Sequence, residues 1–176
     1  QEIDLLPNLS VAENLWLGRE PRRRGAIDWK KMRDETRTVL TELGLDLDPA
    51  SLLGRHSLAV QQLVAIARAI STDVRVLVLD EPTSSLDLDE VSELFRVIRE
   101  LKQRGVAILF VSHFLDQVYE ICDRITVLRG GRLVGEYPTR ELLRIELVQK
   151  MLGRSVSDLA MPPRSDPPTG ELTTPY

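Results

Sequence analysis

The chain has 176 residues, the length of one domain of ordinary size that can bury a hydrophobic core. Hydrophobic residues make up 43% and charged residues 28% of the sequence, as in soluble globular proteins, and no apolar run is long enough to cross a bilayer. The formal net charge of −4 provides no general basic field for nucleic acid, and the single cysteine excludes an internal disulfide. We therefore expect no nucleic-acid partner, and we expect any membrane role to depend on partner subunits.

Two helices are predicted in the first quarter of the chain. Ser10 followed by Glu13 has the spacing of a capping box, which favours a helix that begins there. A second helix is predicted from Asp28 to Leu43, because its apolar residues recur with helical spacing. Asp28 is suited to cap the start of this helix, and Gly44 is expected to end it.

The central stretch predicts a helix followed by a strand. An amphipathic helix is predicted from Gln61 to Ile70, and Ser57 stands where its N-cap would be. Residues 74–79 form an apolar run broken only by Arg75, too short for a helix and rich in β-branched residues. This composition predicts a strand that is buried on both faces of a parallel sheet.

Two adjacent carboxylates, Asp80 and Glu81, end this strand. Pro82 follows them and cannot continue the hydrogen-bonded ladder. Parallel α/β sheets carry their chemistry at the carboxyl ends of the strands. The acid pair is therefore expected at the mouth of a crevice, where a Mg²⁺ ion and a water molecule could be held.

The next segment predicts a βαβ unit. A helix capped by Asp87 or Asp89 and ended by Gly105 has its apolar residues on one face. Residues 106–111 then predict a second buried strand, which pairs in parallel with the first. This topology brings His113 to the same edge of the sheet as the acid pair.

The last third of the chain predicts smaller elements and a tail. A helix is predicted over residues 115–122, and a β-hairpin over residues 124–137 turns on Gly130-Gly131. A final helix is predicted over residues 139–152. Residues 154–176 are rich in proline and predict a flexible tail.

Four segments, in this order and spacing, resemble motifs of the nucleotide-binding subunit of an ATP-binding cassette (ABC) transporter. They are residues 56–70, Leu79-Asp80-Glu81-Pro82-Thr83, Ser84-Ser85-Leu86-Asp87 and Val111-Ser112-His113. The second segment is similar to the Walker B strand with its catalytic glutamate, the third to the D-loop, and the fourth to the segment of the switch histidine. The resemblance covers the chain from Gln1 to about Gly153.

The fold that this resemblance implies is of the α/β class. It is a partial P-loop NTPase cassette, with a mostly parallel sheet, flanking helices and a helical subdomain. Residues 1–72 would hold the Q-loop, the helical subdomain and the signature helix. Residues 73–153 would hold the Walker B, D-loop and H-loop part of the catalytic core, and residues 154–176 would be a linker or tail.

The first residues narrow the resemblance. Gln1 is similar to the Q-loop glutamine, which in the family touches the Mg²⁺ and the attacking water. The segments Trp16–Glu20 and Ile27–Trp29 are similar to the sugar-importer branch (ribose, galactose and xylose), whose members carry two cassettes in one polypeptide. Between them, the basic loop of residues 22–25 is expected to be a solvated turn, with a contact to membrane headgroups or the permease as the alternative.

Ser57 occupies the serine position of the family signature Leu-Ser-Gly-Gly-Gln. In the family, this hydroxyl and the neighbouring backbone amides bind the γ-phosphate of ATP held by the opposite cassette, at a helix N-terminus that favours anions. The resemblance gives this role to Ser57, Leu58 and Ala59. Both glycines of the signature are missing, which removes backbone freedom near the phosphate. The alternative is that Ser57 serves only as an N-cap.

The phosphate-binding loop of the family, G-x-x-x-x-G-K-[ST], does not occur in this sequence. We therefore expect the chain to be the back part of a cassette. By itself it should neither bind ATP measurably nor hydrolyse it, and it should expose apolar sheet edges and self-associate.

The resemblance implies the ATP-hydrolysing subunit of an ABC importer for a carbohydrate, with ATP and Mg²⁺ as cofactors. Asp80 and Gln1 would hold the Mg²⁺, Glu81 would act on the attacking water, and His113 would contact the γ-phosphate. Asp87 is counted with the nucleotide-binding residues and would carry signals across the dimer interface.

The partners that the resemblance implies are transmembrane permease subunits, a second cassette and a periplasmic-type solute-binding protein. The implied location is the cytoplasmic side of the cell membrane. Two alternatives stay open. One is a soluble ABC ATPase without a transport role, and the other is a catalytically degenerate cassette that serves as a structural or regulatory half of a dimer.

Overall fold

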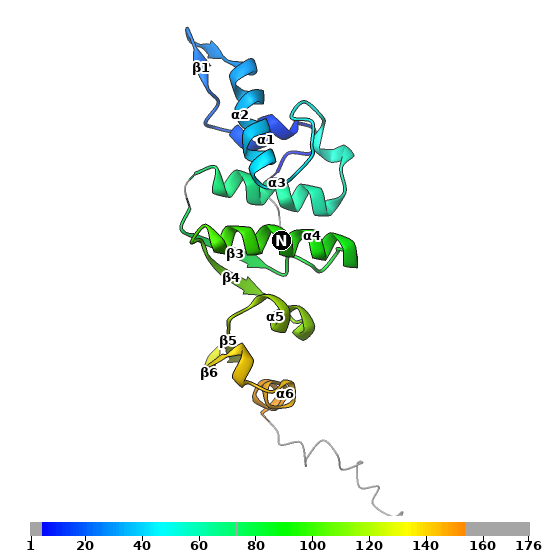
Figure 1. Ribbon diagram of the computed structural model, residues 1–176, viewed down its shortest axis with the longest axis vertical. Coiled ribbons are helices and arrows are strands. Elements are labelled where there is room, and N and C mark those ends of the chain that lie inside the picture. The colour runs from blue at the N-terminus through cyan, green and yellow to red at the C-terminus, as the bar shows by residue number, and fades with distance from the viewer. Residues whose placement is uncertain (1–4, 73, 154–176) are drawn as a thin grey trace, which may run out of the picture. The chain divides into compact units, whose positions relative to one another are not determined.

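The computed structural model describes residues 5–72 and 74–153 of the chain (Figure 1). The chain divides into two compact units, Gln1–Ile121 and Cys122–Tyr176. The three-part organisation with boundaries after residues 72 and 153 stays a prediction. Among the described residues, no helix is both long and apolar enough to span a bilayer.

Helices dominate the first unit. Within the described residues their bounds are α1 (Val11–Trp16), α2 (Trp29–Glu42), η1 (Leu53–Arg55, a 3₁₀ helix), α3 (Leu58–Ile70), α4 (Leu88–Gln103) and α5 (Leu115–Ile121). The predicted caps are confirmed at the first two helices. Ser10 and Glu13 form the capping box of α1, and the Asp28 side chain accepts a hydrogen bond from Lys31 N at the start of α2. Gly44 follows α2 with a φ of 67°, the left-handed conformation that glycine adopts without strain.

The basic segment between α1 and α2 is a small hairpin. β1 (Arg22–Arg23) pairs antiparallel with β2 (Ala26–Ile27), and Arg24 and Gly25 at the tip both have positive φ values. The three consecutive arginine side chains are exposed. The sequence predicted an exposed loop here, and the structure adds the strand pairing.

The central sheet of the first unit joins β3 (Val76–Asp80) and β4 (Ala107–Val111) in parallel, with α4 between them in the chain. The predicted β-α-β order and parallel pairing are confirmed. The expectation that both strands are buried on both faces is wrong within the described residues. Side chains alternate along each strand, and Val76, Val78 and Leu109 are 62%, 58% and 55% exposed.

The physical reason is that helices cover one face of this sheet only. On that face Leu77 and Leu79 are 8% and 5% exposed, and Phe110 meets Phe95 of α4 edge to face, with ring centroids 6.0 Å apart. Phe95 belongs to one hydrophobic core that also includes residues from α1, α2 and α3, and Phe110 packs against this core. The other face of β3 and β4 has no covering layer among the described residues, so its apolar side chains face outward.

The second unit is built on a hairpin. Its elements are β5 (Arg124–Arg129), β6 (Arg132–Pro138), η2 (Thr139–Glu141, a 3₁₀ helix) and α6 (Arg144–Leu152). The predicted turn is confirmed: Gly130 and Gly131 join the antiparallel strands with φ values of 56° and 74°.

The predicted final helix begins later than expected. Thr139 opens only the 3₁₀ turn η2, and Leu142 is extended, with φ −99° and ψ 114°. The side chain of Leu142 is 4% exposed at this break. The burial of Leu142 in an extended conformation therefore interrupts the helix that the local sequence favours, and α6 starts later.

Candidate active site

Glu81 and His113 meet at the carboxyl edge of β3 and β4. Asp80 and Val111 end the two strands opposite each other, and Glu81 N donates one further hydrogen bond to Val111 O at 2.8 Å. The segments that follow β3 and β4 therefore leave the sheet at the same level. His113 Nδ1 lies 2.9 Å from both carboxylate oxygens of Glu81, and the hydrogen bond is made to Oε1. The acid and the imidazole that the topology predicts at one edge are in contact.

The backbone of Glu81 is held in an unusual conformation. Its φ of 46° lies in the left-handed region, which costs a non-glycine residue about 1–2 kcal/mol. Two contacts fix it: the bond from its N–H to Val111, and the bond from Ser84 N to its carbonyl at 3.3 Å. A conformation of this kind persists only where the surrounding structure determines it, and such positions cluster at functional sites.

The carboxylate of Glu81 has one oxygen free to accept a further hydrogen bond. Its side chain is 30% exposed, and within the described residues Oε2 is buried without a hydrogen-bond partner. His113 Nδ1 lies 2.9 Å from this oxygen without making a hydrogen bond to it, so a water molecule could supply the missing bond. The edge can therefore hold a water next to a carboxylate that also contacts an imidazole.

Asp80 lies beside this pair at the end of β3. Its side chain is exposed, and the described part of the chain offers it no hydrogen-bond or ion-pair partner. No cluster of three or more His, Cys, Asp or Glu residues that could hold a metal exists among the described residues. Mg²⁺ in phosphate-transfer sites takes one or two carboxylates together with substrate phosphates. The donor set at this edge fits that kind of site and does not form a metal cage of its own.

The signature residues lie at the start of α3 and do not join the acid–histidine pair. Ser57 is the N-cap, and its Oγ accepts a hydrogen bond from Val60 N at 3.4 Å. Leu58 is 55% exposed, whereas Ala59 is 5% exposed and packs into the core. Within residues 5–72 and 74–153, no hydrogen bond or ion pair links Ser57 to Glu81 or His113. Its phosphate-binding role stays a prediction, and the N-cap is what its side chain does in this structure.

Asp87 caps α4. Its Oδ1 accepts from Glu90 N at 2.8 Å, and Glu90 Oε2 accepts from Asp87 N at 3.2 Å. Of the two predicted candidates, Asp87 and Asp89, the N-cap is therefore Asp87. The D-loop role of Asp87 stays a prediction. Gln1, the predicted Q-loop residue, lies outside the described residues.

Three polar residues were not predicted to have a role: Thr83 and Gln117 next to this edge, and Asn14 in α1. Thr83 Oγ1 donates to Gln117 Oε1 at 2.5 Å, across 34 positions of the chain. Asn14 is fully buried and holds the segment before α1 through hydrogen bonds to Leu6 and Ser10. The signal for Gln117 was its spacing from His113, four residues on, which is one helical turn.

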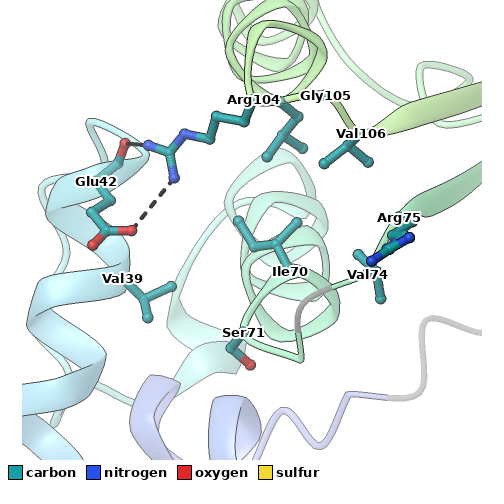
Figure 2. Close-up of a pocket in the computed structure, with 10 residues that line it drawn as sticks. Val39, Glu42, Ile70, Ser71, Val74, Arg75, Arg104, Gly105 and Val106 are labelled. Atoms are coloured by element: carbon teal, nitrogen blue, oxygen red, sulfur yellow. Dashed lines mark hydrogen bonds and ion pairs between the residues drawn. The ribbon is translucent and has the colours of Figure 1, made fainter.

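A pocket of about 550 Å³ lies elsewhere in the first unit (Figure 2). Its lining includes Arg75 and Val106, which precede β3 and β4, and Arg104, which donates to the carbonyl of Glu42 at 2.7 Å. Glu81 follows β3, so the length of the strand separates it from the pocket, roughly 16 Å at 3.3 Å per residue. The pocket is therefore distinct from the acid–histidine edge.

This fold, a parallel βαβ unit with an acid pair and a histidine at its carboxyl edge, is similar to that of the ATP-binding cassettes. Solved structures of that class have this fold. The ATP-binding cassette MJ0796, in a post-hydrolysis state bound to ADP and Pi, gives a TM-score of 0.63 at 26% identity, covering 80% of this chain and 61% of that chain. CbiO1 from Clostridium perfringens, part of the ABC transporter complex cbiONQ, gives 0.67 at 25% identity, covering 82% and 57%.

Residues 1–84 match the family model described as ABC transporter. It is 52% identical over 161 residues to the galactofuranose transporter ATP-binding protein YtfR of Escherichia coli K12, covering 92% of this chain and 32% of that protein. It is 51% identical over 161 residues to the fructose import ATP-binding protein FruK of Bifidobacterium longum (91% and 31%). It is 46% identical over 160 residues to the ribose import ATP-binding protein RbsA of Geobacillus kaustophilus (90% and 32%). The chain thus spans about a third of the length of these relatives.

Proposed function

We propose that this chain is part of the ATP-hydrolysing subunit of an ABC importer for a carbohydrate. The observation that carries the proposal is the contact between Glu81 and His113, in which Glu81 Oε2 accepts no hydrogen bond from the described residues. The cargo class rests on the relatives, which are named for galactofuranose, fructose and ribose transport and are 46–52% identical to this chain. Cassettes do not contact the cargo, so the individual sugar is left open.

Glu81 acts on the attacking water in this proposal. Its Oε2 accepts a hydrogen bond from the water and either polarises the water or takes up its proton. The water oxygen bonds to the γ-phosphorus of ATP, the bond from this phosphorus to the bridging oxygen breaks, and ADP leaves. His113, whose Nδ1 lies 2.9 Å from Glu81 Oε1, donates a hydrogen bond from Nε2–H to phosphate oxygens in its imidazolium form, as negative charge develops. Asp80 and Gln1 would hold Mg²⁺, which when bound neutralises charge on the phosphates.

A second cassette completes the site. Ser57 and the backbone amides of Leu58 and Ala59 stand at a helix N-terminus, which presents N–H groups to an anion held by the opposite cassette. Asp87 lies between the acid pair and α4 and would relay changes across the cassette interface. The permease subunits are the membrane partners, with a periplasmic-type solute-binding protein in the assembled importer. The chain would then lie on the cytoplasmic side of the membrane.

The test is the ATPase rate of the full-length protein, assembled with its permease, in which Glu81 is replaced by Gln. General-base catalysis contributes about 10²–10⁴-fold, so kcat should fall within that range. Glu120→Gln is the matched control, because Glu120 makes an exposed ion pair with Arg99 and should leave the rate unchanged. An undiminished rate in Glu81→Gln would defeat the role given to Glu81.

One observation favours a second candidate, a cassette that is a non-catalytic half of a dimer. The Ser57 hydroxyl serves as an N-cap and Ala59 is buried. The signature segment also lacks the two glycines that would give its backbone conformational freedom near a phosphate. Under this candidate Ser57→Ala would leave the ATPase rate of the intact importer as it is. Under the main proposal the rate falls beyond what the loss of a cap explains, while the amount of folded protein stays the same.

A further inference from the structure

A second contact lies next to the Glu81–His113 pair and joins the same two loops. Thr83 follows Glu81 by two residues in the turn after β3, and its side chain is 3% exposed. Its Oγ1 donates to Oε1 of Gln117 at 2.5 Å. Gln117 lies in the first turn of α5, the helix that begins two residues after His113.

The two contacts close a ring. One side of the ring is the backbone from Glu81 to Thr83, and the other is the backbone from His113 to Gln117. The second side is ordered as a helix, since Val118 N donates to Phe114 O at 3.2 Å and so extends the helical bonding of α5 back to Phe114. Because a helical turn has fixed dimensions, the position of Gln117 constrains where His113 can be.

His113 itself has few constraints. Its side chain is 64% exposed, and besides Glu81 it contacts the ring of Phe114, at a centroid distance of 4.1 Å. Phe114 is 39% exposed, so this ring contact does not fix His113 against the core. A buried anchor in the same loops is provided by Thr83.

We propose that Thr83 and Gln117 are positioning residues that hold His113 against Glu81. The hydrogen bond between them fixes the first turn of α5 on the turn that follows β3. Its loss frees the start of α5, and His113 then spends less time within reach of Glu81 and of the reacting phosphate. This inference deepens the proposed ATPase function and rests on it.

The experiment uses the full-length protein and isosteric variants. Thr83→Val removes the hydroxyl and keeps the shape, whereas Thr83→Ser keeps the hydroxyl and should rescue. Gln117→Leu removes the acceptor, and the double variant completes a double-mutant cycle. Thr38→Val is the matched control, because the Thr38 hydroxyl donates to the carbonyl of Asp34 on an exposed face of α2.

Two readouts are measured, kcat and KM of ATP hydrolysis, and amide hydrogen exchange of residues 112–121 without nucleotide. In Thr83→Val we expect kcat to fall about three- to tenfold, the range set by one hydrogen bond, with KM nearly unchanged. Exchange at the start of α5 should rise by a similar factor, because the opening that exchange reports becomes easier. Thr83→Ser and Thr38→Val should match the unmodified protein in both readouts.

Gln117→Leu should reproduce Thr83→Val, and the double variant should be no worse than either single variant. If the single effects multiply in the double variant, or if Thr83→Val leaves kcat and exchange unchanged, the inference is overturned. The proposed function fails separately, through an undiminished ATPase rate in Glu81→Gln. The exchange measurement needs no turnover, so it still decides whether Thr83 and Gln117 hold the start of α5.

Discussion

Asn14 is a fully buried amide that holds the segment preceding α1 in place. Its Oδ1 accepts from Leu6 N at 2.7 Å, and its Nδ2 donates to Leu6 O at 2.9 Å and to Ser10 O at 3.0 Å. The amide therefore closes a loop over residues 6–10, which also contacts η1 through the bond from Gly54 N to Pro7 O. In the proposed function this loop follows the Q-loop, so its order bears on the site.

Replacing Asn14 with alanine leaves the N–H of Leu6 without its partner, whereas the Leu6 carbonyl still accepts from Leu9 N at 3.0 Å. A buried group left unpaired costs about 1–3 kcal/mol, and the Leu6 N–H is only partly buried, so water replaces some of the loss. Together with the other lost bonds of the Asn14 amide, we expect the free energy of unfolding to fall by about 1–3 kcal/mol. Asn14→Asp keeps the acceptor but directs a carboxylate at three carbonyl oxygens, those of Leu6, Leu9 and Ser10. It should be at least as destabilising at neutral pH and recover as the introduced carboxyl is protonated.

The assay is urea unfolding at low protein concentration, followed by tryptophan fluorescence. The probe is local, because Trp16 lies at the end of α1 and its Nε1 donates to Thr36 Oγ1 at 3.0 Å. Asn8→Ala is the matched control: it deletes the same amide from an exposed position in the same loop and should change stability by less than about 0.5 kcal/mol. If Asn14→Ala costs no more than Asn8→Ala, the reasoning about this buried amide is refuted.

Three further outcomes are expected. A hydrogen bond from Arg96 lowers the pKa of Glu93 in the folded protein from its ordinary value of 4.5. The contribution of this bond to the free energy of unfolding is therefore complete above pH 4.5 and is lost as the pH falls through the lower pKa of the folded state. In urea titrations across this pH range, Glu93→Gln should lose that part of the pH dependence of stability. Gly131→Ala should destabilise the β5–β6 hairpin by about 1 kcal/mol in thermal unfolding, and Gly131→Asn by less, because φ is 74° and asparagine tolerates the left-handed region. The chain should self-associate in sedimentation velocity, and Val78→Thr combined with Leu109→Thr should lower the average sedimentation coefficient; an unchanged distribution would exclude this sheet face as the contact.

The helices were predictable where short-range chemistry determines them. Ser10 with Glu13 and Asp28 with Lys31 are contacts within one turn, so the residue types and their spacing are sufficient. The hairpin turn at Gly130-Gly131 is local in the same sense, because the two positive φ values make a steric demand that glycine meets.

The features that were not predictable depend on contacts distant in sequence. The covering of β3 on one face only is decided by where α3 and α4 pack, and the apolar run looks the same whether one face is covered or both. The bond between Thr83 and Gln117 spans 34 positions, and a threonine in a turn gives no indication of its partner. The break between η2 and α6 accompanies the burial of Leu142, which local propensity does not encode.

The register of the central sheet links the core to the site. Strands β3 and β4 pair from Val76 opposite Ala107 to Asp80 opposite Val111. A slip of one residue would turn the buried side chains, Leu79 among them, to the opposite face, so the packing under α4 fixes this register. The same register makes β3 and β4 end opposite each other, and only then do the segments that follow them bring Glu81 within 2.9 Å of His113. The apolar residues of the sheet therefore determine the geometry of an acid–base pair that lies beyond the ends of the strands.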